Sequence, residues 1–188
     1  MPLNLELKVR IDSPSTFVKA LRKIADYKGV LHQTDTYFEL NAGRLKLRQF
    51  LKGKAELIYY KRSEGRGPRW SNYTRIELKD GRELRGILTR IMGIKIVVKK
   101  KRMLFLYKSA ARVHVDSVNR LGNFVEIESM STKGRAKAKL IFHELVKALN
   151  IDKAQTIRGS YSDLMIARYG AFASTKLSND KGTRVRPS

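Results

Sequence analysis

The side chains of this sequence that are best suited to chemistry are charged residues placed at every second position. Glu6, Lys8 and Arg10 alternate with apolar residues in the segment 3–11, and the segment 124–128 repeats the pattern with glutamates. Alternation with a period of two places the polar side chains of a strand on one face and the apolar ones on the other. We therefore expect charged groups from several strands to lie on a common polar surface.

The basic members of this surface suit a polyanion. Guanidinium groups form paired hydrogen bonds with phosphate oxygens, and ammonium groups act as point charges. Cations contributed by several strands would together bind an extended chain of phosphates. The expected phosphate-binding residues are Lys8, Arg10, Arg44, Lys46, Arg48, Lys61, Lys100, Arg102 and Arg112.

The acidic members need a positive partner, because unpaired carboxylates would repel a polyphosphate. They are Glu6, Asp116, Glu126 and Glu128. Carboxylate oxygens are suitable ligands for Mg²⁺ or Mn²⁺, so a metal site is one interpretation. The alternative is that these acids form salt bridges with cations on neighbouring strands. His114 shares the face of Asp116, and a lone histidine is more often a hydrogen-bonded lining residue than a ligand.

The net charge is the strongest feature of the composition. Among 188 residues, 40 are lysine or arginine and 17 are acidic, which gives a formal charge of +23 at pH 7. Such a field attracts nucleic acids, polyphosphates, nucleotides and anionic membranes, so it indicates a class of partner and no single one. The sequence has no cysteine, which excludes disulfides, thiolate catalysis and zinc sites built on cysteine. Because no apolar run is long enough for a signal peptide or a membrane span, we expect a soluble cytoplasmic protein.

Helical periodicity between the alternating segments predicts the elements that must cover the apolar strand faces. Caps such as Ser13 before Pro14, and glycines at the expected helix ends, set the boundaries. The expected helices run from Pro14 to Gly29, from Asp80 to Gly93, from Ser131 to about Leu149 and from Ser160 to Tyr169. The expected strands occupy residues 3–11, 30–40, 44–48, 55–62, 74–78, 94–107, 112–116 and 124–128, with a loop at 63–68.

A closed barrel is the arrangement that best suits these strands. Closure gathers the charged faces in a lumen and leaves no exposed sheet edge, whereas a flat sheet, the alternative, would do neither. We expect one domain over residues 1–169. Residues 170–188 are dominated by small polar and basic residues without periodicity, which predicts a flexible basic tail.

The order and spacing of these motifs resemble those of the CYTH, or triphosphate tunnel metalloenzyme, superfamily over roughly residues 3–169. The first strand of that family has the pattern Glu-x-Glu-x-Lys, which stands here as Asn4-Leu5-Glu6-Leu7-Lys8. Residues 34–38 and the Gly67-Pro68 loop look closest to the branch labelled as class IV adenylyl cyclases. The other matching segments are 44–48, 60–62, 98–102, 115–118, 121–122, 124–128 and 160–164.

The resemblance implies an α+β fold in which a closed antiparallel β-barrel of about eight strands has its helices packed outside. It also implies a triphosphate bound to the tunnel cations and one or two divalent metal ions, Mg²⁺ or Mn²⁺, bound to the carboxylates. Asn4 departs from the family pattern, because a neutral amide replaces the first glutamate and reduces the attraction for a metal ion. The implied catalytic residues are Glu6, Lys8, Lys61 and Arg102, and the implied metal ligands are Glu6, Glu126, Glu128 and Asp116.

Three functions agree with these features. The first is metal-dependent hydrolysis of inorganic tripolyphosphate, thiamine triphosphate or a nucleoside triphosphate. The second is synthesis of cyclic AMP from ATP by an adenylyl cyclase, which also needs a nucleoside pocket, for which Trp70 and Tyr73 are candidates. The third is a non-catalytic module that binds polyphosphate or RNA, with the basic surface and tail available to nucleic acid. Triphosphatase is our leading hypothesis, and the sequence leaves the preferred substrate and the oligomeric state open.

Overall fold

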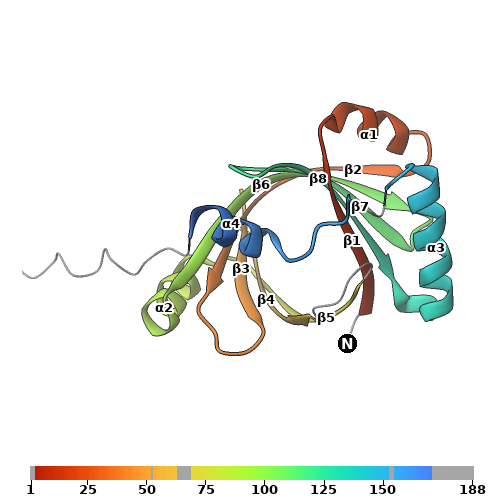
Figure 1. Cartoon of the computed structure of the whole chain (residues 1–188). Coiled ribbons are helices and arrows are strands. Elements are labelled where there is room, and N and C mark those ends of the chain that lie inside the picture. Colours follow the sequence, from red (N-terminus) through yellow and green to blue (C-terminus); the bar gives the residue numbers. More distant parts are fainter. Residues whose placement is uncertain (1–2, 52, 63–68, 153–154, 171–188) are drawn as a thin grey trace, which may run out of the picture.

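A closed barrel of antiparallel strands forms the body of the molecule (Figure 1). The structure is a computed structural model that describes residues 3–51, 53–62, 69–152 and 155–170. The strands in this part of the chain are β1 (Leu3–Ile11), β2 (Asp26–Phe38), β3 (Arg44–Phe50), β4 (Ala55–Arg62), β5 (Arg69–Leu78), β6 (Ile94–Tyr107), β7 (Ala111–Val118) and β8 (Gly122–Met130). Their order around the barrel is β1, β5, β4, β3, β2, β6, β7, β8. The expected α+β fold with a closed antiparallel barrel is confirmed.

The barrel closes because β1 has a partner on each side. It pairs with β5 near its start and with β8 along most of its length, where Glu6 lies opposite Glu128 and Lys8 lies opposite Glu126. A shift of one residue would turn the apolar side chains of β1 inward, so the alternation fixes this register. The charged faces of β1 and β8 therefore meet inside the barrel.

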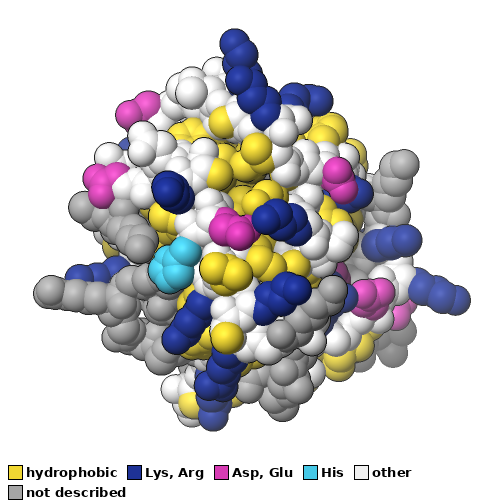
Figure 2. Space-filling view, turned by 90° about the vertical axis from the view of Figure 1, so that its right-hand side faces the viewer, with side chains coloured by type: hydrophobic (Ala, Val, Ile, Leu, Met, Phe, Trp, Pro, Cys, Tyr) yellow, Lys and Arg dark blue, Asp and Glu magenta, His cyan; other side chains and the backbone are white. Residues whose placement is uncertain are grey.

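The main hydrophobic core lies between the outer face of the barrel and α3 (Arg135–Ala148). Leu5 and Val9 of β1 are buried there together with Phe142 and Leu145 of the helix. Complete burial of a large apolar side chain stabilises the fold by about 1.5–3 kcal/mol. Figure 2 shows the side of the molecule that carries α3, where basic side chains project among hydrophobic ones. The apolar strand faces thus point outward to a helix, as the alternation predicts.

The first helix is shorter than predicted. The remaining helices are α1 (Pro14–Leu21), α2 (Arg82–Met92) and α4 (Tyr161–Tyr169). The prediction that the first helix continues to Gly29 is wrong, because β2 begins at Asp26 and pairs with β6 along almost its whole length. Tyr27 packs on Phe105 of β6, with ring centroids 5.2 Å apart. Cross-strand pairing therefore prevails over the local helical periodicity.

Several other boundaries also differ from the prediction. Strands β1, β4 and β6 have the predicted bounds. Strands β3, β5, β7 and β8 extend beyond their alternating segments, and β2 runs from Asp26 to Phe38 instead of over residues 30–40. The third helix begins at Arg135 after a short 3₁₀ turn at Ser131–Lys133, because Gly134 has a φ of 91° that a helix does not allow. The predicted loop at 63–68 and all of the predicted tail except Gly170 lie outside the described residues.

One end of the barrel is filled beneath α4. Figure 1 shows α4 and the segment before it passing across the barrel. The helix starts with a capping box in which the Ser160 hydroxyl accepts from the Asp163 backbone and the Asp163 carboxylate accepts from the Ser160 backbone. The buried cluster at this end contains Tyr37, Ile96, Val98, Val118, Leu121, Phe124, Tyr161 and Met165. In the described part of the chain, every helix is too short or too polar to cross a membrane.

Candidate active site

The barrel lumen contains a cavity of about 280 Å³. All eight described strands and the start of α4 contribute to its lining. Alternation places these side chains on the inner face, so residues far apart in the sequence meet here. The structure brings together nine of the predicted site residues: Glu6, Lys8, Lys46, Arg48, Lys100, Arg102, Arg112, Glu126 and Glu128.

Lys61 does not line the lumen, and the expectation that it faces the phosphates is wrong. Ile58 and Tyr60 hold the inward positions of β4, so Lys61 falls on the opposite side of the strand. Its side chain is exposed and borders a separate pocket at the α4 end of the barrel. The sequence shows the alternation of this strand, but it does not show which half of the residues faces inward.

Arg10 and Arg44 have the inward phase of their strands but lie beyond the lumen. Arg10 Nη1 donates to the Leu121 carbonyl oxygen at 2.6 Å, and Arg44 Nη2 donates to Asp163 Oδ2 at 3.0 Å. Neither arginine is part of the cavity lining. The expectation that they bind phosphate in the lumen fails, because the hydrophobic cluster under α4 makes the open tunnel shorter than its strands.

Asp35 of β2 is the centre of one group of lumen cations. Its carboxylate accepts from Arg48 at 2.8 and 3.1 Å, from Lys46 at 3.0 Å and from Lys100 at 2.7 Å. Burial raises the pKa of Asp35, but Arg48, Lys100 and Lys46 outweigh this effect and hold the pKa well below its ordinary value. Asp35 is therefore ionised, and it fixes three basic side chains that come from two strands.

Asp116 organises a second group and is placed away from the other predicted metal ligands. Both oxygens accept from the Arg102 guanidinium, at 2.7 and 2.6 Å, and Tyr161 donates its hydroxyl at 2.8 Å. Asp116 is completely buried and does not line the cavity. With both oxygens occupied, it acts as a counter-charge for Arg102, which corrects its expected place among the carboxylates around a metal ion.

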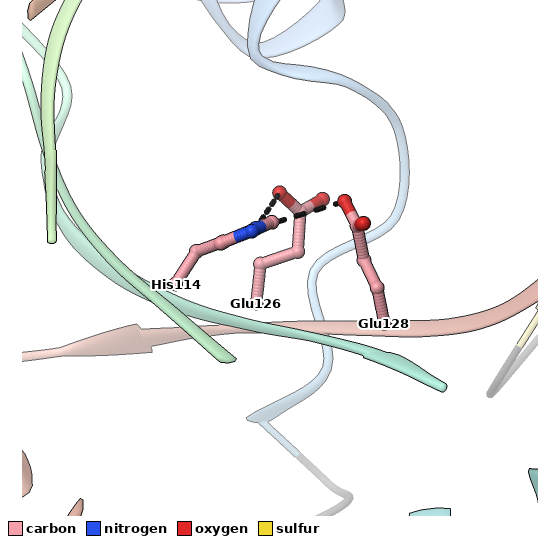
Figure 3. Close-up of side chains that lie close together, drawn as sticks. All are labelled: His114, Glu126 and Glu128. Carbon is pink, nitrogen blue, oxygen red and sulfur yellow. Dashed lines mark ion pairs between the residues drawn. The ribbon is translucent and has the colours of Figure 1, made fainter. Parts of the chain in front are cut away.

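His114, Glu126 and Glu128 form a compact cluster on β7 and β8 (Figure 3). One potential ligand atom from each lies within 4.8 Å of the others, and this is a spacing that one metal ion can join. His114 Nδ1 lies 3.7 Å from Glu126 Oε2 and 3.6 Å from Glu128 Oε1, which is longer than a hydrogen bond. The cluster is a candidate metal site in which a histidine replaces an expected carboxylate.

The same carboxylates also pair with cations across the strands. Glu126 lies 3.4 Å from Lys8 Nζ and 2.8 Å from Arg102 Nη2, while Glu128 lies 2.9 Å from Arg112 Nη2. Burial raises the pKa of Glu126, but Lys8, His114 and Arg102 hold that pKa well below its ordinary value. Glu126 is therefore charged. The sequence left salt bridges and metal binding as alternative roles for these acids, and in the structure the same carboxylates form the salt bridges and the candidate metal site.

Lys100 is a lumen cation that gives up its proton more easily than an ordinary lysine does. Burial lowers the pKa of Lys100 to about 7, because the attraction of Asp35 is opposed by Arg48, Arg102 and Lys46. Arg48 and Arg102 stay charged, since Asp35 and Asp116 raise the pKa of each guanidinium against the effect of burial.

Asn4 and Glu6 enter the lumen from β1 beside the carboxylate cluster. When its amide is oriented to satisfy both of its polar groups, Asn4 accepts a hydrogen bond from Arg112 Nη2 at 3.1 Å. Arg112 also pairs with Glu128, so the amide is one contact away from the cluster. Glu6 lines the cavity but does not belong to the three-residue cluster.

Sequence reasoning missed Asp35 and undervalued His114. Asp35 stands in the predicted strand 30–40 between Gln33 and Tyr37, which also line the cavity or lie close to it. The signal that could have identified Asp35 is a single acidic residue on the same strand face as Gln33 and Tyr37, because such an acid needs a cationic partner inside the barrel. His114 shares an inner face with Arg112, and this spacing alone does not distinguish a lining residue from a ligand.

A model of the CYTH domain family matches residues 3–161. The chain belongs to the CYTH domain family. A protein of Methanocaldococcus jannaschii named "Putative adenylate cyclase MJ0240" is 27% identical over 178 residues, which cover 86% of this chain and 98% of that protein. The resemblance seen in the sequence is thus confirmed at the level of the family.

Solved structures show the same CYTH fold at low sequence identity. PH1012 protein from Pyrococcus horikoshii OT3 aligns with a TM-score of 0.77 and 21% identity, over 86% of this chain and 98% of that one. HpAC1 from Hippeastrum, described as a "putative adenylyl cyclase" with a dominant triphosphatase activity, aligns with a TM-score of 0.64 and 15% identity, over 93% of this chain and 98% of that one.

Proposed function

We propose that this CYTH protein is a divalent-metal-dependent triphosphatase that hydrolyses a triphosphate held in the lumen. The observation that carries the proposal is the position of the His114, Glu126 and Glu128 cluster beside an array of cations in one cavity. The cations suit the oxygens of a phosphate chain, and the cluster suits a divalent ion. Together they supply the parts that phosphoryl transfer to water requires.

The donor set fits a divalent metal ion. Glu126 and Glu128 offer hard carboxylate oxygens, and the buried Nδ1 of His114 has no hydrogen-bond partner among the described residues. These three side chains would hold the ion. A bound Mg²⁺ or Mn²⁺ supplies Lewis-acid polarisation of a phosphoryl oxygen.

The other lumen residues divide the remaining work. Lys46, Arg48 and Lys100, which are prearranged on Asp35, bind the phosphate chain through charge-assisted hydrogen bonds. Lys8 and Arg102 lie against Glu126, where they neutralise the charge that develops on the transferred phosphoryl group. Glu6 lines the lumen opposite Glu128 in the strand register and orients the attacking water.

Hydrolysis has better support than cyclisation. A cyclase needs side chains that receive a nucleoside, and Trp70 packs against the outer core with its ring 5.5 Å from the Arg135 guanidinium. Tyr73, the other candidate, does line the cavity. The activity described for HpAC1 agrees with hydrolysis in a relative that carries a cyclase name.

A product screen tests the proposal. The protein is incubated with tripolyphosphate, thiamine triphosphate and ATP, each with Mg²⁺, with Mn²⁺ or with a chelator. We expect metal-dependent release of orthophosphate from at least one substrate. Pyrophosphate together with cyclic AMP from ATP would support the cyclase instead. Tight tripolyphosphate binding without turnover would support a non-catalytic binding module.

A further inference from the structure

The candidate metal cluster contains a buried nitrogen that has no hydrogen-bond partner among the described residues. His114 is 4% exposed, and the nitrogen in question is its Nδ1. A buried polar atom that lacks a partner costs about 1–3 kcal/mol. Figure 3 shows the imidazole turned toward the carboxylates of Glu126 and Glu128. The orientation and the missing partner both indicate that a ligand completes this position.

The two carboxylates of the cluster already have cationic partners. Glu126 pairs with Lys8 and Arg102, and Glu128 pairs with Arg112. The Nδ1 atom of His114 lies 3.7 Å from Glu126 Oε2 and 3.6 Å from Glu128 Oε1, which is too far for a hydrogen bond to either carboxylate. An imidazole nitrogen in this position can offer a lone pair to a metal ion held between the three side chains.

We infer that His114 is a metal ligand and that the site consequently takes a first-row transition ion, Mn²⁺, in preference to Mg²⁺. This inference rests on the proposed function, because it concerns the metal site of the proposed triphosphatase. Mg²⁺ favours oxygen ligands and retains its waters, whereas imidazole nitrogen favours transition metals.

Direct metal binding tests the inference without any substrate. Mn²⁺ is titrated into the protein while the electron paramagnetic resonance signal of free Mn²⁺ is followed, and Mg²⁺ is then added as a competitor. We expect Mn²⁺ to bind at least about tenfold more tightly than Mg²⁺, in line with the effect of an added nitrogen ligand. Pulsed resonance of the Mn²⁺ complex should show coupling to a ¹⁴N nucleus.

His114→Gln should weaken Mn²⁺ binding by at least about tenfold, as loss of metal-site contacts commonly does, and should change Mg²⁺ binding much less. Glu128→Gln should weaken both ions, because it removes an oxygen ligand from the same cluster. The matched control is His143→Gln on the exposed face of α3, which should leave both affinities unchanged.

Two results would overturn the inference. One is equal affinity of the wild-type protein for Mn²⁺ and Mg²⁺, and the other is a Mn²⁺ complex without nitrogen coupling. Both are measured on the wild-type protein, so they stand even if His114→Gln does not fold. A protein that selects Mn²⁺ through His114 but hydrolyses no triphosphate would contradict the proposed activity and leave the metal assignment intact.

Discussion

Asp35 contacts three basic side chains of the lumen, and Asp116 contacts a fourth. Their exposed fractions are 1% and 0%, so neither carboxylate is solvated. Asp35 holds together three cations that would otherwise repel one another. Asp116 balances the single charge of Arg102. These cations are therefore held in place before any ligand enters, and for the phosphate chain of the proposed function this would reduce the ordering cost of binding.

Asp35→Asn should destabilise the free protein by about 3–5 kcal/mol, the cost of leaving buried charges without their partner. Tripolyphosphate should recover much of this loss, because it supplies the missing negative charge and binds only the folded state. The measurement is thermal unfolding of both proteins across a tripolyphosphate titration. The matched control is Asp26→Asn, which breaks an exposed pair on the same strand. An equal ligand-induced stabilisation in Asp35→Asn and wild type would contradict the role given to Asp35.

Lys100 should make polyphosphate binding depend on pH. Folding lowers the pKa of Lys100 to about 7, so the amine is charged below that pH and largely neutral above it in the free protein. Because a bound anion favours the charged amine, binding above pH 7 should take up a proton. The affinity should then fall by up to about tenfold as the pH rises by one. Lys100→Arg stays charged and should remove this uptake.

Calorimetry in buffers of different ionisation enthalpy measures the protons taken up when tripolyphosphate binds. The comparison of wild type with Lys100→Arg cancels the ionisation of the ligand itself. Equal proton uptake in the two proteins would mean that Lys100 is already charged in the free lumen.

The lowered pKa also predicts that the free energy of unfolding rises as pH increases above 7, because the unfolded chain there binds more protons than the folded one.

The limits of sequence reasoning at the residue scale follow from the period of a strand. The period placed Lys8, Arg48 and Glu128 on one surface, and the structure gathers them in one cavity. The period does not fix which alternate residues of a strand face inward. For this reason Lys61 is expected in the lumen, although Ile58 and Tyr60 hold the inward positions of its strand. It also does not reveal partners, so Asp116 and Glu126 received the same role although one is enclosed by Arg102 and Tyr161.

At the scale of the elements, the local sequence pattern is sufficient to predict a strand where a glycine shortly before it marks its start. Strand β4 begins after Gly53 and β6 begins after Gly93, and both were predicted with their observed ends. The start of strand β2 could not be predicted from its own residues. Its first residues have helical periodicity, and only pairing with β6, which lies far along the chain, makes them a strand. Pairing between distant segments is the information that a local pattern lacks.

The capping box of α4 connects this element to the closed end of the lumen. Asp163 Oδ2 accepts from the Ser160 backbone at 2.7 Å and from Arg44 Nη2 at 3.0 Å. Burial raises the pKa of Asp163, but these hydrogen bonds and the charge of Arg44 outweigh it and lower the pKa. The resulting stabilisation is present above the pKa of the unfolded chain and is lost as pH falls through the lowered pKa of the folded state.

Asp163→Asn should lower the free energy of unfolding at neutral pH by about 1 kcal/mol, the usual value of a helix cap. The difference from wild type should shrink as the solution is made acidic, as measured by urea denaturation. Hydrogen exchange of the α4 amides should also become faster. The control is Asp80→Asn, which neutralises the carboxylate that accepts from the Arg82 backbone at the start of α2 and should leave α4 exchange unchanged. Unchanged α4 exchange in Asp163→Asn would show that the capping box does not hold the helix.

On the scale of the whole molecule, the excess positive charge lies mostly outside the lumen. Among the described residues, seven basic and four acidic side chains line the cavity, and the buried Asp35 and Asp116 lie against its cations. The lumen is thus nearly balanced, although the whole chain carries +23. The outer charge is suited to attracting anions from a distance. Binding of nucleic acid to this outer surface and the cellular location stay predictions.

Raising the salt concentration should therefore lower kcat/KM for a triphosphate severalfold and leave kcat nearly unchanged. Between about 0.1 M and about 1 M salt the Debye length shortens from about 10 Å to about 3 Å, which screens exposed charges far more than buried pairs.

Lys99 and Lys101 of β6 are exposed on the outer face, on either side of the inward Lys100. Lys99→Gln combined with Lys101→Gln should lower kcat/KM at low salt and flatten its salt dependence, because part of the steering field is gone. The control is Ser117→Ala, which lies opposite Lys101 in the sheet and carries no charge. If kcat falls with salt as steeply as kcat/KM, the charges that matter are those of the lumen, and the outer field does not steer the substrate.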